Sequence, residues 1–300
     1  MTSERNHLRN QQRETWDRFA GGWKSWDSWV VGWLAPVGEA MIRHAELRDG
    51  SDVLDVATGT GEPGLSAAAL VPQGRVTLSD LAEGMLAVAS EKAAQRGLRN
   101  VTTQECDAGA LPFADASFDA VLCRFGFMFF PDVAAAAAEF ARVVRPGGRV
   151  SAAVWGKPAN NAWATTIMST ISRHVATPAV PPDAPGLFRC APDGHLSAVF
   201  VDAGLTDVTE EEVSFEMVHD TPERYWSFMT DVAAPVVAGL SRADLQLQET
   251  IRAEVLKMVQ PDLSDARVHL RSTATVVSGY RATEPRDRRP PRPAQIPTES

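Results

Sequence analysis

Residues 53–64, VLDVATGTGEPG, carry the strongest structural signal in the sequence. The run VLDVA is typical of a short buried strand, and Gly59, Gly61 and Gly64 then form the pattern G-x-G-x-x-G where a helical segment begins. A glycine turn between a strand and a helix is typical of nucleotide sites in α/β proteins, because it lets a ligand approach the backbone and the helix N-terminus closely. A tight turn that needs glycine only for its backbone angles shows the same pattern, so the motif alone leaves the nucleotide open.

From Ser51 to Trp155, short apolar runs alternate with helical patterns, and this alternation predicts βαβ units and a parallel sheet. Two later segments with strand character extend it, so the expected fold class is α/β: a doubly wound, mostly parallel seven-stranded sheet with helical cap insertions. The predicted strands are 53–57, 75–80, 101–106, the opening residues of the segment 118–130, 149–155, 206–218 and 268–282, with a turn at 145–148. The predicted helices are several within 8–48, then 62–71, 83–96, 132–144, 161–175, 194–203, 221–238 and 241–259.

Composition excludes several classes of protein. The 300-residue chain is 44% hydrophobic, enough for one large core with an appended cap, and its formal net charge of −9 argues against nucleic acid as the main partner. The sequence shows no secretory leader and no run of about 18 apolar residues, so a cytoplasmic protein without a membrane partner is expected. Cys106, Cys123 and Cys190 form no CxxC pair, which predicts reduced, buried thiols and no metal site.

Two aspartates accompany the strand pattern. Asp55 lies inside the first strand, four residues before Gly59, where a buried carboxylate needs a partner such as a cationic ammonium or ordered water. Asp80 ends the second strand, where a carboxylate can accept from both hydroxyls of a ribose; capping the next helix is the alternative role. Leu81 and Met85 follow and could form an apolar wall for a base, although Met85 also suits the core.

The segment VLDVATGTG, residues 53–61, resembles the first motif of class I S-adenosylmethionine-dependent methyltransferases, in which an acidic residue and glycine backbone accommodate the methionine part of the cofactor. Ala57 stands where that motif more often has glycine. Residues 110–133 are similar to a segment of methyltransferases of the menaquinone and ubiquinone biosynthesis type, and residues 142–155 resemble their turn into the fifth strand. The resemblance implies a Rossmann-like methyltransferase fold with S-adenosyl-L-methionine as the cofactor.

Further site residues follow from this resemblance. Asp107 and Ala108 match the position where an acidic side chain accepts from the adenine amino group and a backbone N–H meets a ring nitrogen. Arg124, at the carboxyl end of the fourth strand, is expected to offer its backbone carbonyl to the methionine ammonium. Its side chain either forms a structural ion pair, the favoured reading, or attracts an anionic acceptor. The expected cofactor-binding set is Asp55, Ala57, Gly59, Gly61, Asp80, Leu81, Met85, Asp107, Ala108 and Arg124.

These expectations divide the chain into four parts. Residues 49–156 form the S-adenosylmethionine-binding core, 157–282 hold the cap insertions and the remaining strands, and 283–300 form a disordered tail rich in proline and arginine. Residues 1–48 form helices that either dock on the sheet or close over the cofactor as a lid hinged at Gly21-Gly22. These helices carry Trp16, Trp23, Trp26, Trp29 and Trp33.

Methyl transfer from a sulfonium depends on positioning and on exclusion of water more than on a covalent nucleophile. The lack of GxSxG and HExxH motifs is therefore compatible with it, and no catalytic residue is predicted. If a phenol or amine acceptor needs a general base, the candidates are His174, His195 and His219, which fall in the cap or at its edges. Apolar residues within 125–130 could line the pocket of a small-molecule acceptor that is methylated on oxygen, nitrogen or carbon.

Two other functions remain open from the sequence. An NAD(P)-dependent oxidoreductase shares the glycine pattern and the acidic residue at the end of the second strand. Asp55, the Asp107-Ala108 pair and the RPGG segment at 145–148 favour the methyltransferase instead. A non-catalytic cofactor-binding scaffold would carry the same motifs without turnover. The oligomeric state and the identity of the acceptor are not predicted.

Overall fold

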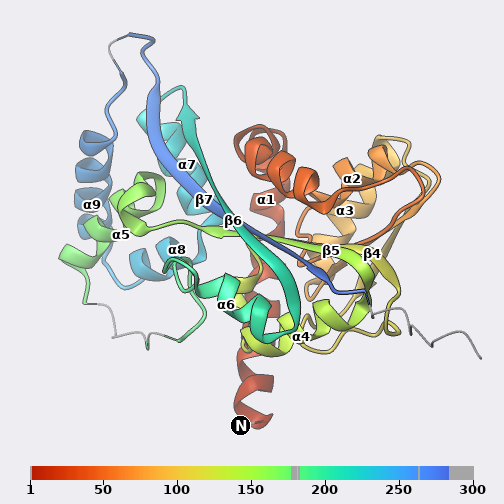
Figure 1. The fold of residues 1–300 in the computed structure, drawn as a ribbon. Coiled ribbons are helices and arrows are strands. Elements are labelled where there is room, and N and C mark those ends of the chain that lie inside the picture. The colour runs from red at the N-terminus through yellow and green to blue at the C-terminus, as the bar shows by residue number, and fades with distance from the viewer. Residues whose placement is uncertain (1, 177–180, 182, 263, 284–300) are drawn as a thin grey trace, which may run out of the picture.

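Seven strands form one sheet in the order β3-β2-β1-β4-β5-β7-β6 (Figure 1). In the computed structural model, which describes residues 2–176, 181, 183–262 and 264–283, strands β1 to β5 run parallel and β7 is antiparallel to both of its neighbours. This confirms the predicted doubly wound, mostly parallel α/β fold. The strands are β1 (Asp52–Val56), β2 (Arg75–Asp80), β3 (Val101–Glu105), β4 (Phe118–Arg124), β5 (Val144–Trp155), β6 (Leu205–His219) and β7 (Val268–Arg281).

The order of the strands reverses between β1 and β4, which pair in parallel at the centre of the sheet. Both strands are almost wholly buried, which explains why their sequences are continuous apolar runs rather than alternating ones. Ligands of open α/β sheets bind outside the carboxyl ends of the strands at such a reversal. The topology therefore places the expected site above β1 and β4.

Helices cover both faces of the sheet. They are α1 (Thr2–Ala45), α2 (Gly64–Leu70), α3 (Glu83–Gln95), α4 (Val133–Val143), α5 (Ala162–His174), α6 (His195–Asp202), α7 (Pro222–Val232), α8 (Ala234–Leu240) and α9 (Leu245–Met258). On one face, α2, α3 and the C-terminal part of α1 share a core that includes Met41, Leu65 and Leu78. On the other face, α4 and α6 pack around Phe140 and Phe200.

The N-terminal segment is one continuous helix, not the several helices expected from the sequence. Helix α1 runs through the middle of the molecule in Figure 1, and its N-terminal end stands clear of the sheet. Its central turns are held on α3 by ion pairs of Asp27 with Lys92 and of Lys24 with Glu91. None of the helices in the described ranges is both long and apolar enough to cross a membrane.

Strands β6 and β7 are longer than the parallel strands and pair along almost their whole length. The chain between them forms α7, α8 and α9, which pack with α5 near the end of β6 and the beginning of β7 (Figure 1). This helical group interrupts the regular βα alternation, and its role as a cap stays a prediction.

Two predicted boundaries are wrong. Strand β5 begins at Val144, so residues 145–148 form an irregularity within the strand rather than a turn before it, and Arg145 ties that irregularity to Asp52 and Asp119. The helix predicted at 221–238 is two helices, because Ala233 is extended and Pro235 starts a new helix. The predicted disordered tail, apart from residue 283, lies outside the described residues.

Candidate functional site

A cavity of about 490 Å³ opens at the carboxyl ends of β1 to β5, around the point where the strand order reverses. The loops after β1, β2 and β3 form one end of it, and side chains of α1, α5, α7 and α8, with the ends of β4 and β5, form the other. Most of the predicted cofactor-binding residues line it, whereas Asp55 and Gly61 lie behind its wall. The predicted residues along the cavity are Ala57, Gly59, Asp80, Leu81, Met85, Asp107, Ala108 and Arg124.

Asp55 braces the glycine turn from below. Its Oδ2 accepts hydrogen bonds from Thr58 Oγ1 at 2.7 Å and from the Gly64 N–H at 2.9 Å. Its Oδ1 is buried and has no hydrogen-bond partner, and burial raises the pKa of this carboxyl to about 7. The side chain thus fixes the shape of the loop, and contact with the methionine ammonium stays a prediction.

Ala57, which stands where the methyltransferase motif more often has glycine, adopts a backbone conformation typical of glycine. Its φ is +54°, in the left-handed region that favours glycine, and Gly59 at +55° follows in the same region. A glycine at 57 would adopt this conformation without strain, whereas alanine pays about 1 kcal/mol or more. The turn therefore keeps the shape that the motif requires although one glycine is replaced.

Asp80 holds the first two loops together. Its Oδ2 accepts from the Gly59 N–H at 2.9 Å and its Oδ1 accepts from the Ala82 N–H at 3.0 Å, where α3 begins. Burial raises the pKa of this carboxyl. Asp80 does not cap α3, because Ala82 is the N-cap residue and none of the free N–H groups of the first turn donates to Asp80. Each Asp80 oxygen keeps a second lone pair for a ribose hydroxyl.

Asp107 and Ala108 form the third loop along the cavity. Asp107 Oδ1 accepts from the Gly109 N–H at 2.9 Å, and its Oδ2 lies 3.8 Å from Arg9 Nη1 on the first turns of α1. Within the described part of the chain, no group accepts from the Ala108 N–H. Arg9 is a residue that sequence reasoning missed, because only the path of α1 brings it to this loop.

Arg124 ends β4 and lines the cavity. Burial lowers the pKa of its guanidinium, and the charges of Glu62, Asp55 and Asp27 oppose that effect. The structural ion pair favoured from the sequence is not found: among the described residues, no carboxylate lies within 4.0 Å of Arg124 and no hydrogen bond holds its side chain. A cation of this kind beside a cavity has the charge to bind an anionic group of a ligand.

The other end of the cavity is an apolar chamber formed by Trp33, Phe125, Trp155, Trp163, Phe228 and Met229. The Phe125 ring stacks on Trp155 with centroids 4.1 Å apart, and Phe228 stands edge-on to Trp33 at 5.8 Å. The charged residues that line the cavity all lie on the strand-end loops or the first turns of α1: Arg9, Glu62, Asp80, Asp107 and Arg124. The two ends of the cavity therefore differ sharply in polarity.

The N-terminal tryptophans lie partly in the core and partly along the cavity, and closure of α1 as a lid stays a prediction. Trp26 and Trp33 belong to the core, which supports docking, while Trp16, Trp23 and Trp33 line the cavity. The proposed hinge at Gly21-Gly22 is helical in the structure, and a Cβ at Gly22 would lie 2.2 Å from the Asp231 carbonyl oxygen. Gly22 thus allows α1 and α7 to approach closely.

The candidate histidines do not reach the cavity. His174 pairs with Glu254 at 3.0 Å, and His195 begins α6, which packs on α4, without lining the cavity. His219 is buried, stacks on Trp29 at 4.2 Å and has no hydrogen bond on either ring nitrogen; burial lowers its pKa to about 4. Cys106 lines the cavity, but burial raises the pKa of its thiol to about 11, so it stays protonated.

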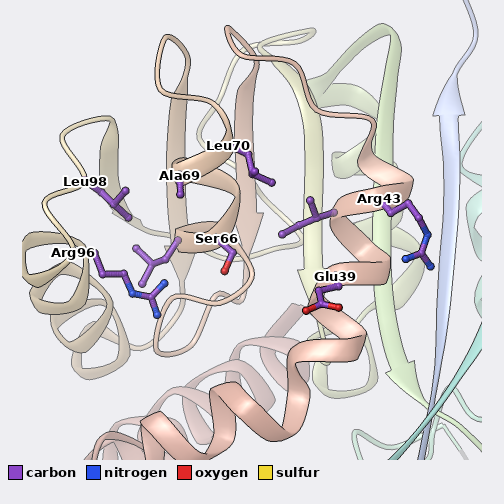
Figure 2. A pocket seen from close by; sticks show the side chains of 9 residues that line it. Glu39, Arg43, Ser66, Ala69, Leu70, Arg96 and Leu98 are labelled. Atoms are coloured by element: carbon purple, nitrogen blue, oxygen red, sulfur yellow. The ribbon is translucent and has the colours of Figure 1, made fainter.

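A second hollow lies away from the strand ends (Figure 2). Glu39 and Arg43 reach it from α1, and Ser66 and Leu70 reach it from α2, with Arg96 at the end of α3. Its walls share no residue with the predicted cofactor-binding set. The cavity above β1 and β4 is therefore the candidate active site.

Comparison with known proteins identifies the family. Residues 53–148 match a family model described as a methyltransferase domain. The Mycobacterium tuberculosis protein called "Uncharacterized protein Rv1403c" is 33% identical over 235 residues, which cover 77% of this chain and 82% of that protein. The M. tuberculosis protein called "Uncharacterized protein Rv1405c" is 43% identical over 123 residues, 41% of this chain and 43% of that protein.

A demethylmenaquinone methyltransferase from Deinococcus radiodurans is 40% identical over 129 residues, 43% of this chain and 52% of that protein. This chain thus matches about half the length of the Deinococcus enzyme and less than half the length of Rv1405c. The crystal structure of the YcgJ protein from Bacillus subtilis superposes with a TM-score of 0.56 at 22% identity, covering 82% of this chain and 97% of that one, which shows a shared fold. The chain belongs to the class I S-adenosylmethionine-dependent methyltransferases.

Proposed function

We propose that this protein transfers the methyl group of S-adenosylmethionine to a small, largely apolar molecule held in the apolar chamber. The observation that carries the proposal is the single cavity that joins the strand-end loops to this chamber. A donor bound on the loops and an acceptor bound in the chamber would meet near Arg124 and Phe125, at the end of β4. The name of one relative, demethylmenaquinone methyltransferase, is in keeping with an apolar acceptor.

The loop end has the donors and acceptors that the cofactor needs. Asp80 would accept from the ribose hydroxyls, and Asp107 from the adenine amino group, with the Ala108 N–H free to meet a ring nitrogen. Leu81 and Met85 would cover the adenine as an apolar wall. Each of these residues lines the same cavity, so one adenosyl group can contact all of them.

The methionine part would lie between the glycine turn and the end of β4. The Arg124 backbone carbonyl would accept from the ammonium, while the unpaired guanidinium would bind the carboxylate through a charge-assisted hydrogen bond. Asp55 would act from behind the turn by holding Thr58 and Gly64 in place. These residues fit the two charges of an amino-acid group.

When bound, S-adenosylmethionine supplies an electrophilic methyl group on a sulfonium. The chain's own contribution is to hold the acceptor in line and to exclude water, and the aromatic walls do both. None of the described histidines lines the cavity, so the acceptor atom is expected to react without a histidine base. We call the loop end of the cavity the donor end, because the methyl donor would bind there. Helix α1 would cover it with Trp16, Trp23 and Arg9.

Ligand-induced thermal stabilisation tests the proposal. S-adenosylhomocysteine at about 100-fold above its Kd should raise Tm by about 5 °C, whereas NAD and NADP should leave it unchanged. Transfer of a radiolabelled methyl group into organic-extractable products of an apolar acceptor panel should follow. Stabilisation by NAD but not by S-adenosylhomocysteine would favour the oxidoreductase, and binding without any transfer would favour a non-catalytic scaffold.

A further inference from the structure

Helix α3 begins at the donor end without a capping residue of its own. Its N-cap position is Ala82, whose methyl group cannot accept a hydrogen bond from the first turn. A different helix supplies the cap, because Asp17 Oδ1 of α1 accepts from the Gly84 N–H at 3.0 Å. The carboxylate also meets the positive end of the α3 dipole. Asp17 therefore joins the N-terminal part of α1 to the first turn of α3.

The two helices approach each other closely at this hydrogen bond. A Cβ at Gly84 would lie 3.2 Å from Asp17 Oδ1 and 3.3 Å from Ala20 Cβ, so glycine makes room for α1. A small buried cluster forms at the contact, with two indole rings packed against it: Ala20, Ala82 and Met85, with Trp16 and Trp23. Met85 and both tryptophans also line the cavity. The contact thus places the rings of α1 beside the predicted adenine wall.

Little else holds the first turns of α1 on the protein. None of residues 7–19 is buried. An ion pair of Arg9 with Asp107 spans 3.8 Å, and Trp16 stands edge-on to Phe129 with centroids 5.2 Å apart. A segment with so few buried contacts undocks at a low cost in free energy. One charged hydrogen bond is therefore a large share of what keeps this segment docked.

The rest of α1 is fixed more firmly. Asp27 pairs with Lys92 at 2.7 Å, where both side chains are largely buried. Trp26 lies in the core and donates to a carboxylate of α7 at 2.9 Å. Loss of the Asp17 hydrogen bond should therefore free residues 7–19 and leave the remainder of the helix in place.

We infer that Asp17 is a positioning residue of the cofactor site, which docks residues 7–19 of α1 over the donor end by capping α3. This inference rests on the proposed function and adds a residue that is not one of the described residues lining the cavity. Docking brings Trp16 and Arg9 to the bound molecule. A cofactor that contacts docked α1 favours the docked state, so its apparent affinity depends on how much of the protein is docked.

Two substitutions of Asp17 separate this role from a loss of charge. Alanine removes the acceptor, whereas asparagine keeps an oxygen that caps helices about as well as aspartate. We expect Asp17→Ala to bind S-adenosylhomocysteine about three- to tenfold more weakly in calorimetry, the effect of one lost cap. Asp17→Asn should stay within about twofold of wild type. Glu14→Ala is the matched control, because Glu14 is an exposed carboxylate of the same helix without an ion pair or hydrogen bond among the described residues.

Amide hydrogen exchange gives a readout that a general loss of stability would not produce. In wild type, bound S-adenosylhomocysteine should slow exchange in residues 7–19 by about threefold or more, because it holds the segment docked. Asp17→Asn and Glu14→Ala should show the same slowing, and Asp17→Ala should show less of it at equal saturation. Residues 26–45 should exchange alike in all four proteins.

The outcomes are distinct. Equal affinity of Asp17→Ala and wild type overturns the inference, and so does an equal loss of affinity in Asp17→Asn or Glu14→Ala. Exchange in residues 7–19 that S-adenosylhomocysteine leaves unchanged in wild type also overturns it, even if a variant fails to fold. In each of these cases cofactor binding itself stands. If S-adenosylhomocysteine does not bind to wild type, the proposed function fails and the inference fails with it.

Discussion

The donor end and the apolar chamber are two halves of one cavity built on different plans. The donor end consists of loops that directly follow β1, β2 and β3, and it presents carboxylates and backbone N–H groups. The chamber consists of side chains from four helices and the ends of β4 and β5, and it presents rings. Polar binding is thus tied to the sheet, whose geometry the fold fixes, whereas apolar binding depends on how the cap packs.

The largest expected effect tests whether the chamber is part of the core. Phe228 is fully buried, so Phe228→Ala should lower the free energy of unfolding by about 3–5 kcal/mol, measured by chemical denaturation. Affinity for S-adenosylhomocysteine should change by less than about twofold, since the donor loops are untouched. Leu245→Ala, at an exposed position, is the control and should change neither quantity. A tenfold loss of donor affinity in Phe228→Ala would show that the two halves are not separable.

The next effect tests whether the buried Asp55 carboxyl, behind the donor end, lowers the free energy of unfolding. The pKa of Asp55 is about 7 in the folded protein, against about 3.8 without burial, so the unfolded chain ionises first as pH rises. Wild-type stability should therefore fall between about pH 4 and pH 7. Asp55→Asn cannot ionise and should match wild type near pH 4 but exceed it at pH 8 by about 2–4 kcal/mol in denaturation curves.

Asp52→Asn is the matched control for that change. Asp52 lies on the same strand but is ion-paired with Arg145, so its loss should leave stability at pH 8 unchanged or slightly lower. If Asp55→Asn and wild type have parallel stability curves from pH 4 to pH 8, the buried carboxyl is not destabilising.

The third effect separates cofactor binding from the role of Asp80 in holding the two loops together. Asp80→Asn should lose about 10- to 100-fold in S-adenosylhomocysteine affinity by calorimetry, because charged hydrogen bonds to the ribose are removed. One backbone N–H also loses its acceptor, so a stability loss of about 1 kcal/mol should accompany it. Asp244→Ala removes a helix cap far from the cavity and should cost similar stability without any change in affinity. Equal affinities for Asp80→Asn and wild type would leave Asp80 only its hydrogen bonds to the Gly59 and Ala82 N–H groups.

The same contrast explains what the sequence could predict. Gly59, Asp80 and Asp107 each lie at the end of a strand, so a strand pattern alone brings them to one edge of the sheet. Trp163 and Phe228 meet Trp33 only through the packing of α5 and α7 against α1, and no periodicity encodes that meeting. The unpaired state of Arg124 was missed for the same reason, because it depends on which carboxylates the fold keeps away.

Helix α1 has a thermodynamic consequence for the whole enzyme. Trp16 at the donor end and Trp33 in the chamber belong to the same uninterrupted helix, about 25 Å apart along its axis. Under the proposed function, this one helix would contact both ligands. Any coupling that α1 carries between the two halves must then be reciprocal: each ligand changes the affinity of the other by the same factor.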